Sequence, residues 1–548
     1  MKPGGLTRRH VLTAFALLGA AHVGACGGDF DTSDESQGWG ARSDLKAVPL
    51  DSALAFVDAT HGTAFMVDAH LGTPHARPIE VGHTVAKYEK RNGKDELLVL
   101  SRGLVGTRDV KDEPPALWVL PAAGGVPVKV PLDARYTSFA QSADGTFVML
   151  FFAETNAKAG EVAFNPNQMA LVNLSTPTIA PRTLTVPSLG GVPTAIDFSP
   201  VLALKQPRPL VLVRSKNYVT LLDLLHGQAE NREEISIPLT LPEDGRTLFP
   251  VQVEWDVVGP GVFIRVSGGS DIFSVRFAPL DEAATAVAKN DFRAVLSQLA
   301  AGTSPSSMVL YNAGEGTRLL VAGADKALFV IDPVSSRTVQ IPIEHEVGWL
   351  SVWTPVAGPG AGEPTPQALL LPSKASKATF VDLLKLESLK TRNLEVVNLT
   401  APATGLSPFP AQGLAVLQHM DRSLTVLDLA ARTVSPIRSD VGIGGLRASG
   451  ATPSTLYMLT PSERLGLLTL VPGRLGVSDI RLDAPATEVL VTPAALEPDM
   501  VSRLLVVHAD NGGYVTVMNA ATPTRETAKS IRGFVATDLL SRTERNVP

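Results

Sequence analysis

The sequence predicts an all-β fold made of repeated units, and three observations lead to this prediction. From residue 48 onward the chain consists of short runs rich in aliphatic and β-branched residues, separated by glycine, proline, aspartate or asparagine about every ten residues. A thirteen-residue pattern recurs along this part of the chain. Further apolar runs lie before and after the copies, so each unit supplies more than two strands.

The recurring pattern begins in one aliphatic strand, passes a polar turn and ends in a second aliphatic strand closed by aspartate or asparagine. Six copies align without a gap, at residues 56–68, 211–223, 320–332, 370–382, 416–428 and 507–519. Their starting points differ by multiples of about 50 residues, and weaker copies fill the intervals, at 115–132, 167–187, 264–276 and 457–469. The sequence therefore contains ten candidate units.

Each hairpin has a short apolar run before it, as at 194–199 and 250–255, and often another after it, as at 337–343. Four strands in about 50 residues are typical of one blade of a β-propeller. We therefore expect a β-propeller of about 8–10 four-stranded blades in one ring, spanning residues 48–540, with 541–548 as a C-terminal tail. Because propellers usually have four to eight blades, two smaller propellers are the alternative.

Two further elements follow from local patterns. Residues 533–540 read as an inner strand, whereas the first unit begins at 52–57 with no inner strand of its own, so we expect the chain end to complete the first blade. Phe292, Val295, Leu296 and Leu299 recur at helical spacing before Gly302, which predicts one short helical insertion near 282–300. That helix would pack on the outside of a blade or, alternatively, bind a partner.

The N-terminus has the layout of an export signal. Arg8 and Arg9 precede an uncharged stretch from residue 11 to 25, which is shorter than the ~18–20 apolar residues of a membrane-spanning helix, so residues 1–25 are predicted to be a signal peptide. The sequence VGAC at 23–26 resembles the lipobox of bacterial lipoproteins, which implies that Cys26, the only cysteine, receives a lipid. Residues 7–12 also resemble a twin-arginine export motif, and both export routes stay open.

Residues 26–47 follow as an acidic, polar tether between the lipid and the folded domain. Asp29, Asp31 and Asp34 could form a calcium loop, but the spacing lacks the glycine and the distal glutamate of an EF-hand. Gly27 and Gly28 follow the cysteine in place of the aspartate that resembles an inner-membrane retention signal. The outer membrane is therefore the expected location.

Charge and composition exclude some classes of partner. The formal net charge is −6, and it becomes −9 without residues 1–25, so nucleic acid is not expected as a partner. The domain after Cys26 has no cysteine and can form no disulfide. Residues 142–150 resemble the turn-and-strand element in blades of TolB-like and YVTN-type bacterial propellers.

Candidate chemical groups are few. The aspartates that close the repeated pattern are interpreted as turn residues, because a side-chain oxygen there can accept from backbone amides and asparagine replaces aspartate once; they are Asp68, Asp223, Asp332, Asp382, Asp428 and Asn519. His61, His70, His75 and His83 could bind a metal only if the fold brought them together. No motif of a nucleophile, a zinc protease or a dinucleotide site occurs, so no catalytic, cofactor or metal residue is assigned.

Together these features predict a membrane-anchored lipoprotein of the cell envelope. Its propeller is expected to be a non-catalytic scaffold that binds a protein or a small-molecule ligand at one face. The alternative is a propeller enzyme of the lactonase, lyase or hydrolase type, with its site at the mouth of the central channel.

Overall fold

The computed structural model describes residues 45–535 except 107, 109–110, 154–164, 178–179, 186–191, 206, 225–233, 242–243, 281–291, 314–315, 355–364, 373, 384–393, 410–411, 438–441, 449–454, 472–474, 498 and 511. The expected signal peptide, Cys26, most of the tether and the C-terminal tail lie outside the described residues. Within the described part, no helix is long and apolar enough to cross a bilayer.

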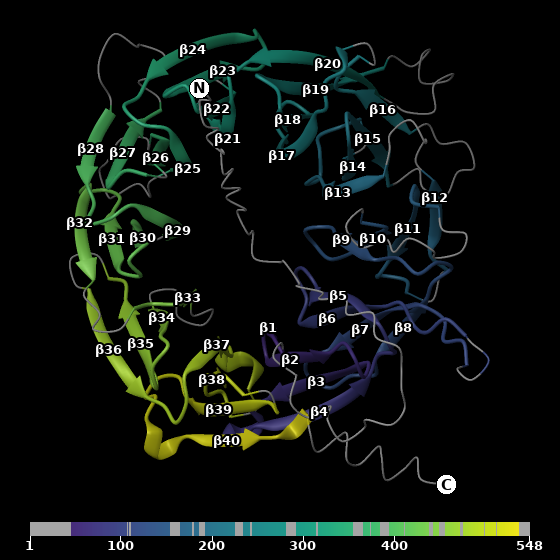
Figure 1. Ribbon diagram of the computed structural model, residues 1–548, viewed down its shortest axis with the longest axis vertical. Coiled ribbons are helices and arrows are strands. Elements are labelled where there is room, and N and C mark those ends of the chain that lie inside the picture. Colours follow the sequence, from purple (N-terminus) through teal and green to yellow (C-terminus); the bar gives the residue numbers. More distant parts are fainter. Residues whose placement is uncertain are drawn as a thin grey trace, which may run out of the picture. The chain divides into compact units, whose positions relative to one another are not determined.

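The described strands form ten four-stranded antiparallel sheets in one ring, which is a β-propeller (Figure 1). In every sheet the four strands are neighbours in sequence order, so each sheet is one blade, numbered blade 1 to blade 10 along the chain. The prediction of one ring is confirmed, with ten blades at the upper end of the expected range. The helices that lie wholly within the described residues are the single turns η2 (His70–Gly72), η8 (Ala494–Leu496) and η9 (Arg525–Thr527).

From blade 1 to blade 10, the inner strands are β1 (Ala47–Pro49), β5 (Val85–Lys90), β9 (Ser138–Gln141), β13 (Pro193–Phe198), β17 (Phe249–Asp256), β21 (Pro305–Asn312), β25 (Val347–Trp353), β29 (Ala403–Phe409), β33 (Gly445–Ala448) and β37 (Ala486–Val491). The second strands are β2 (Ala53–Asp58), β6 (Glu96–Ser101), β10 (Phe147–Phe151), β14 (Leu210–Ser215), β18 (Gly261–Ser267), β22 (Thr317–Gly323), β26 (Gln367–Pro372), β30 (Leu414–His419), β34 (Thr455–Leu459) and β38 (Arg503–His508).

The third strands are β3 (Thr63–Asp68), β7 (Ala116–Pro121), β11 (Gln168–Asn173), β15 (Tyr218–Asp223), β19 (Asp271–Pro279), β23 (Ala327–Asp332), β27 (Lys377–Asp382), β31 (Leu424–Asp428), β35 (Arg464–Thr469) and β39 (Tyr514–Asn519). The outer strands are β4 (His75–Glu80), β8 (Val128–Pro131), β12 (Arg182–Thr185), β16 (Ile235–Pro238), β20 (Phe292–Ala300), β24 (Arg337–Pro342), β28 (Leu394–Asn398), β32 (Thr433–Ile437), β36 (Gly476–Arg481) and β40 (Lys529–Arg532).

The repeated sequence pattern is the hairpin of the second and third strands. In blade 1, for example, β2 pairs with β3 so that Phe56 lies opposite Phe65. We call the space between two neighbouring blades a wedge. All residues of β2 are buried, because alternate side chains enter the wedges on its two sides: Leu54 faces blade 10 and Ala55 faces blade 2. Burial on both faces requires a continuous apolar run, and this is why these two strands were visible in the sequence.

Ten clusters of buried apolar side chains hold the ring together, one between each pair of neighbouring blades. Nine of them join blades that are consecutive in sequence. The tenth joins blade 10 to blade 1: Leu505 and Val515 pack with Leu54 and Phe65. The ring is therefore closed by side-chain packing of the same kind that holds every other pair of blades.

The expected strand exchange between the chain ends is wrong. Blade 1 has its own inner strand, β1, which pairs with β2 and contacts β37 of blade 10. Residues 533–535 form no strand, and residues 536–540 lie outside the described part. Instead, the ring of Phe534 lies 5.4 Å from that of Phe56 and 5.8 Å from that of Phe65, between blades 10 and 1. The end of the chain thus supplies an aromatic side chain to this wedge.

The expected helical insertion is also wrong for the residues that the structure describes there. Residues 292–300 form β20, which pairs with β19 over its whole length; residues 281–291 lie outside the described part. Phe292 packs between blades 4 and 5 and Leu299 between blades 5 and 6, whereas Val295 and Leu296 are exposed. Pairing with a long neighbouring strand overrides the helical spacing of the four apolar residues.

Candidate functional site

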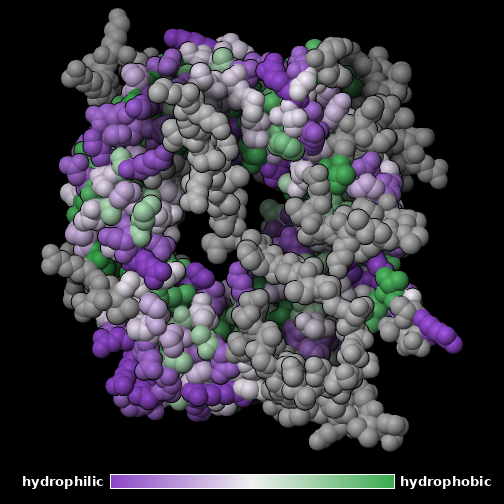
Figure 2. Space-filling model, in the orientation of Figure 1, coloured by the Kyte–Doolittle hydropathy of each residue, from purple (hydrophilic) through white to green (hydrophobic). Residues whose placement is uncertain are grey.

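The inner strands form the wall around the centre of the ring (Figure 1). All six side chains of β5 and five of the seven in β25 are partly exposed, in contrast to the fully buried β2. Figure 2 shows that hydrophilic residues cover most of the described surface on one side and that the ring is hollow at its centre. A wall of partly exposed side chains around a hollow centre is the place where a propeller of this width can bind a ligand.

Seven inner strands share a β-bulge after their first paired residues; they belong to blades 2, 4, 5, 6, 7, 8 and 10. In four of these blades the bulged residue is serine or threonine, and its hydroxyl donates to a carbonyl of the second strand. These residues are Thr194, Ser306, Thr404 and Thr487. A bulge bends a strand and redirects its side chains, so the shared bulge gives these strands the same orientation at the wall.

An acidic residue occupies the same place in three inner strands. Counting from the bulge, Glu89, Asp197 and Glu254 are equivalent, and they lie opposite Leu98, Leu212 and Phe263 of the second strands. Blades 2, 4 and 5 therefore present a carboxylate at one level of the wall. We call Glu89, Asp197 and Glu254 the acidic arc.

Each member of the acidic arc has a neighbour that donates to it. Lys87 Nζ lies 3.1 Å from Glu89, and Gln141 of blade 3 donates to the same carboxylate at 2.9 Å. Arg214 Nε lies 2.7 Å from Asp197. Gln252 donates to Glu254 at 3.1 Å.

The donors of the arc also bridge the wedges. Lys87 donates to the carbonyl of Phe139 in blade 3 at 2.6 Å, and Arg214 donates to that of Pro250 in blade 5 at 3.3 Å. Arg265, which has the same place in blade 5 as Arg214 in blade 4, donates to the carbonyl of Pro305 in blade 6 at 3.2 Å. These bonds fix the inner strands relative to one another, so the wall is rigid where it carries the charges.

Burial shifts the ionisation of several of these groups. It raises the pKa of Asp197, against the opposing effect of Arg214, and it raises the pKa of Glu254, against the hydrogen bond from Gln252. Burial likewise lowers the pKa of Arg265. The buried carboxylates of Asp197 and Glu254 favour a ligand group that is positively charged or donates hydrogen bonds.

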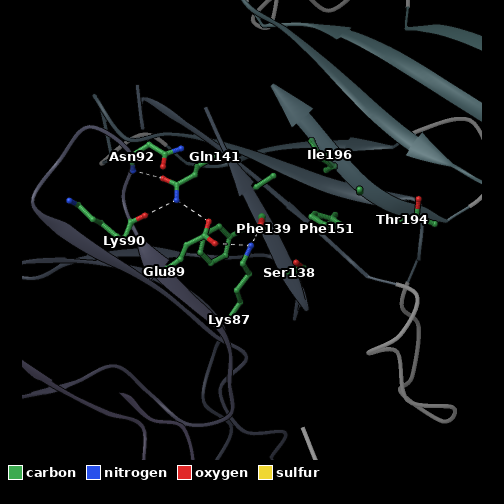
Figure 3. A pocket seen from close by; sticks show the side chains of 12 residues that line it. Lys87, Glu89, Lys90, Asn92, Ser138, Phe139, Gln141, Phe151, Thr194 and Ile196 are labelled. Atoms are coloured by element: carbon green, nitrogen blue, oxygen red, sulfur yellow. Dashed lines mark hydrogen bonds and ion pairs between the residues drawn. The ribbon is translucent and has the colours of Figure 1, made fainter. Parts of the chain in front are cut away.

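Next to the arc, the inner strands of blades 2, 3 and 4 enclose an open hollow of about 590 Å³ (Figure 3). Lys87, Glu89 and Gln141 form one linked group on its wall, and Thr194 and Ile196 of blade 4 lie on the other side. Its size is within the range of about 300–1,000 Å³ that is usual for ligand sites.

The four histidines of the sequence analysis do not meet. Nδ1 of His61 lies 2.9 Å from Asp58, and Nδ1 of His83 lies 2.8 Å from Glu113. His61 lies in the turn between β2 and β3, and His83 lies in the connection from β4 to β5, on the same side of the ring. His70 lies in η2, between β3 and β4, and His75 is the first residue of β4, so both are at the opposite side. Among the described residues, no group of three or more histidine, cysteine, aspartate or glutamate side chains could hold a metal ion.

The closing residues of the repeats mostly act in turns, as expected. Asp332 accepts from Val334 N at 2.9 Å, Asp428 from two amides, and Asp68 and Asn519 from the amide two residues on. Asp382 ends β27. Asp223 differs: it is buried and pairs with buried Arg208 at 2.8 Å, an ion pair that the sequence analysis missed.

The acidic arc was also missed, although the sequence contains a signal for it. The apolar runs at 194–199 and 250–255 each contain one acidic residue, Asp197 at the fourth place of the first run and Glu254 at the fifth place of the second. A charge within an inner strand is worth attention because it lies on a wall where side chains are only half buried. The repeated pattern covers the second and third strands of each blade, so it does not reveal which residues of the inner strands are equivalent.

No family model and no curated protein matches this chain. Among solved structures, it is similar to BBS1N in a crystal structure of its complex with ARL6DN, at 12% identity, over 60% of this chain and 92% of that chain, with a TM-score of 0.31. It is also similar to the dihydro-heme d1 dehydrogenase NirN in complex with DHE, at 10% identity, over 82% of this chain and 76% of that chain, with a TM-score of 0.39. At these values neither likeness says what this chain binds or catalyses.

Proposed function

We propose that this protein is a binding scaffold of the cell envelope, anchored to a membrane by a lipid on Cys26. The observation that supports binding most strongly is the acidic arc, because blades 2, 4 and 5 place a carboxylate at the same level of a rigid, half-exposed wall. The observation that supports the anchor is the single cysteine at the end of the uncharged N-terminal stretch.

The chemistry of the wall indicates the class of ligand. The raised pKa values of Asp197 and Glu254 mean that burial disfavours their charged forms, and a cation or a group of hydrogen-bond donors from a ligand would relieve this cost. We propose that the ligand is a basic or amide-rich segment of a protein partner, or a small molecule of the same character, held across blades 2 to 5.

A crosslinking experiment tests the site. A photoreactive residue at Thr194, which is exposed in the hollow, should give a discrete adduct in cells, and one at Val396 on an outer strand should not. Glu254→Gln should weaken the Thr194 adduct, whereas Glu346→Gln, which removes an exposed acid beside β25 of blade 7 and outside blades 2 to 5, should leave it unchanged. An adduct that ignores Glu254→Gln, or none at all, would contradict the proposed binding wall.

The anchor is tested separately. Cys26→Ser should move the protein from the membrane fraction to the soluble fraction, and the wild-type chain should take up labelled palmitate and fractionate with the outer membrane. A Cys26→Ser chain that remains in the membrane fraction would refute the lipid anchor while leaving the binding wall untouched.

One observation favours the alternative of a propeller enzyme. Two carboxyl groups with raised pKa values on neighbouring inner strands are a common feature of acid–base sites. Metal analysis of the purified chain helps to separate the two functions, because one tightly bound equivalent of a metal would favour the enzyme over the scaffold.

A further inference from the structure

The outer strand of blade 5 differs from all other outer strands. β20 has nine residues, whereas the other nine outer strands have four to six. It pairs with β19 along its whole length, from Asp271 opposite Ala300 to Pro279 opposite Phe292. It is also the last strand of its sheet, and in the described part of the chain no strand pairs with its other edge.

The other outer strands carry the features by which proteins prevent pairing at a sheet edge. Each contains a proline or a charged residue, and the strands are short. These residues are Pro78 in β4, Pro131 in β8, Arg182 in β12, Pro238 in β16, Pro342 in β24, Glu395 in β28, Pro436 in β32, Asp479 in β36 and Lys529 in β40.

β20 lacks this protection over most of its length. After Arg293, the seven residues Ala294–Ala300 contain no charge, no proline and no glycine, and this run alone is longer than any other outer strand. Two of its apolar side chains face solvent, with Val295 42% and Leu296 38% exposed. A long, neutral, apolar edge is a site for the addition of another strand.

We propose that β20 pairs antiparallel with β20 of a second copy of this chain, centred on Leu296. The sequence FRAVLSQLA is self-complementary in this register: Leu296 lies opposite itself, Val295 opposite Ser297, and Arg293 opposite Leu299, so the two arginines do not face each other. A two-fold pairing uses the free edge of β20 in both copies, so no edge is left for a third copy. It therefore produces a closed dimer and not a fibre.

The position of β20 in the ring suits this arrangement. It lies at the outer rim, where the outer strands run along the edge of the ring (Figure 1). A two-fold axis between two such strands runs along the axis of the ring, so both copies present the same side. The blades on both sides have shorter outer strands, of four residues in β16 and six in β24, which leaves β20 accessible to a second ring.

A cysteine crosslink tests the register in the full chain. In a Cys26→Ser background the chain has no other thiol, so Leu296→Cys places one thiol on the proposed two-fold axis. Cβ atoms opposite each other in antiparallel strands lie about 5 Å apart, so a short bis-maleimide should convert Leu296→Cys to a dimer. Val396→Cys on β28, where the native valine is 43% exposed, is the matched control and should give no covalently linked dimer on a denaturing gel. Equal crosslinking of the two variants would overturn the proposal.

Sedimentation equilibrium provides the second measurement. At roughly 50 µM the purified chain should have twice the mass of one copy, and Leu296→Lys should weaken the association about fivefold or more, because it places two like charges opposite each other. Val396→Lys should not change the association. A wild-type chain that sediments with the mass of one copy would overturn the proposal, and a strand of a different protein would then be the candidate partner of β20.

Discussion

Replacing Phe534 with alanine should loosen the joint between blade 10 and blade 1. Its side chain is 7% exposed and packs on Phe56 and Phe65. The backbone of Gly513 packs closely against the phenyl ring of Phe534, because a Cβ on Gly513 would lie 2.5 Å from Phe534 Cζ. The wedge that closes the ring therefore depends on a residue near the end of the described chain.

The expected cost follows from the burial. Phe→Ala at a buried site costs about 3–5 kcal/mol of the free energy of unfolding, and the lower end applies because a chain end relaxes more easily than a strand. The entropy of unfolding is about 2.1 cal/mol/K per residue, which gives about 1 kcal/mol/K for roughly 490 residues. Phe534→Ala should therefore lower Tm by about 3 °C.

Calorimetry measures this change, and hydrogen exchange locates it. Exchange in Phe534→Ala should accelerate in blades 1 and 10 and stay unchanged in blades 4 to 7. Phe263→Ala is the matched control, because Phe263 is fully buried between blades 5 and 6 and should accelerate exchange there instead. A cost of Phe534→Ala below about 1 kcal/mol, or exchange that accelerates evenly around the ring of blades, would contradict the role of Phe534 between blades 10 and 1.

Three further changes have defined outcomes. Burial lowers the pKa of His508, so the imidazole binds a proton less readily in the folded protein than in the unfolded chain. The free energy of unfolding should therefore fall as the pH drops through about 6.5. His508→Asn should flatten the dependence of Tm on pH between about 7.5 and 5. Arg208→Met should cost about 3–5 kcal/mol in denaturant unfolding because it removes the guanidinium that pairs with the buried Asp223 carboxylate. Arg208→Met with Asp223→Leu should cost much less; equal costs would contradict this. Gly513→Ala should cost about 1–3 kcal/mol, since its φ is +85° and its Cβ would meet Phe534; an unchanged Tm would contradict the packing described for this wedge.

The second and third strands could be predicted from the sequence because they are buried on both faces. In β2 and β3 nearly every position is apolar, and the polar turn between them has a fixed length, so copies align without gaps. The inner and outer strands carry weaker patterns. β1 is only three residues long and ends in Pro49, and nothing in its sequence separates it from the preceding linker.

The two errors have one physical cause, which is that long-range pairing decides the structure of segments with an ambiguous local pattern. Phe292, Val295, Leu296 and Leu299 fit a helix, yet β19 extends for nine residues and pairs with all of them. At the ring closure, residues 533–540 read as a strand, but β1 already occupies the inner edge of β2. The acidic arc could not be found by periodicity, because equivalence between Glu89, Asp197 and Glu254 appears only after the bulges are aligned.

An experimental structure of the full chain, viewed along the axis of the ring, tests the central claim most directly. That claim is that ten blades close into one ring without exchanging a strand between the chain ends, which places the acidic arc on one continuous wall. We expect ten four-stranded blades, with β1 beside β37 and Phe534 packed against Phe56 and Phe65. Another number of blades, or residues 533–540 paired as a strand with β2, would contradict it.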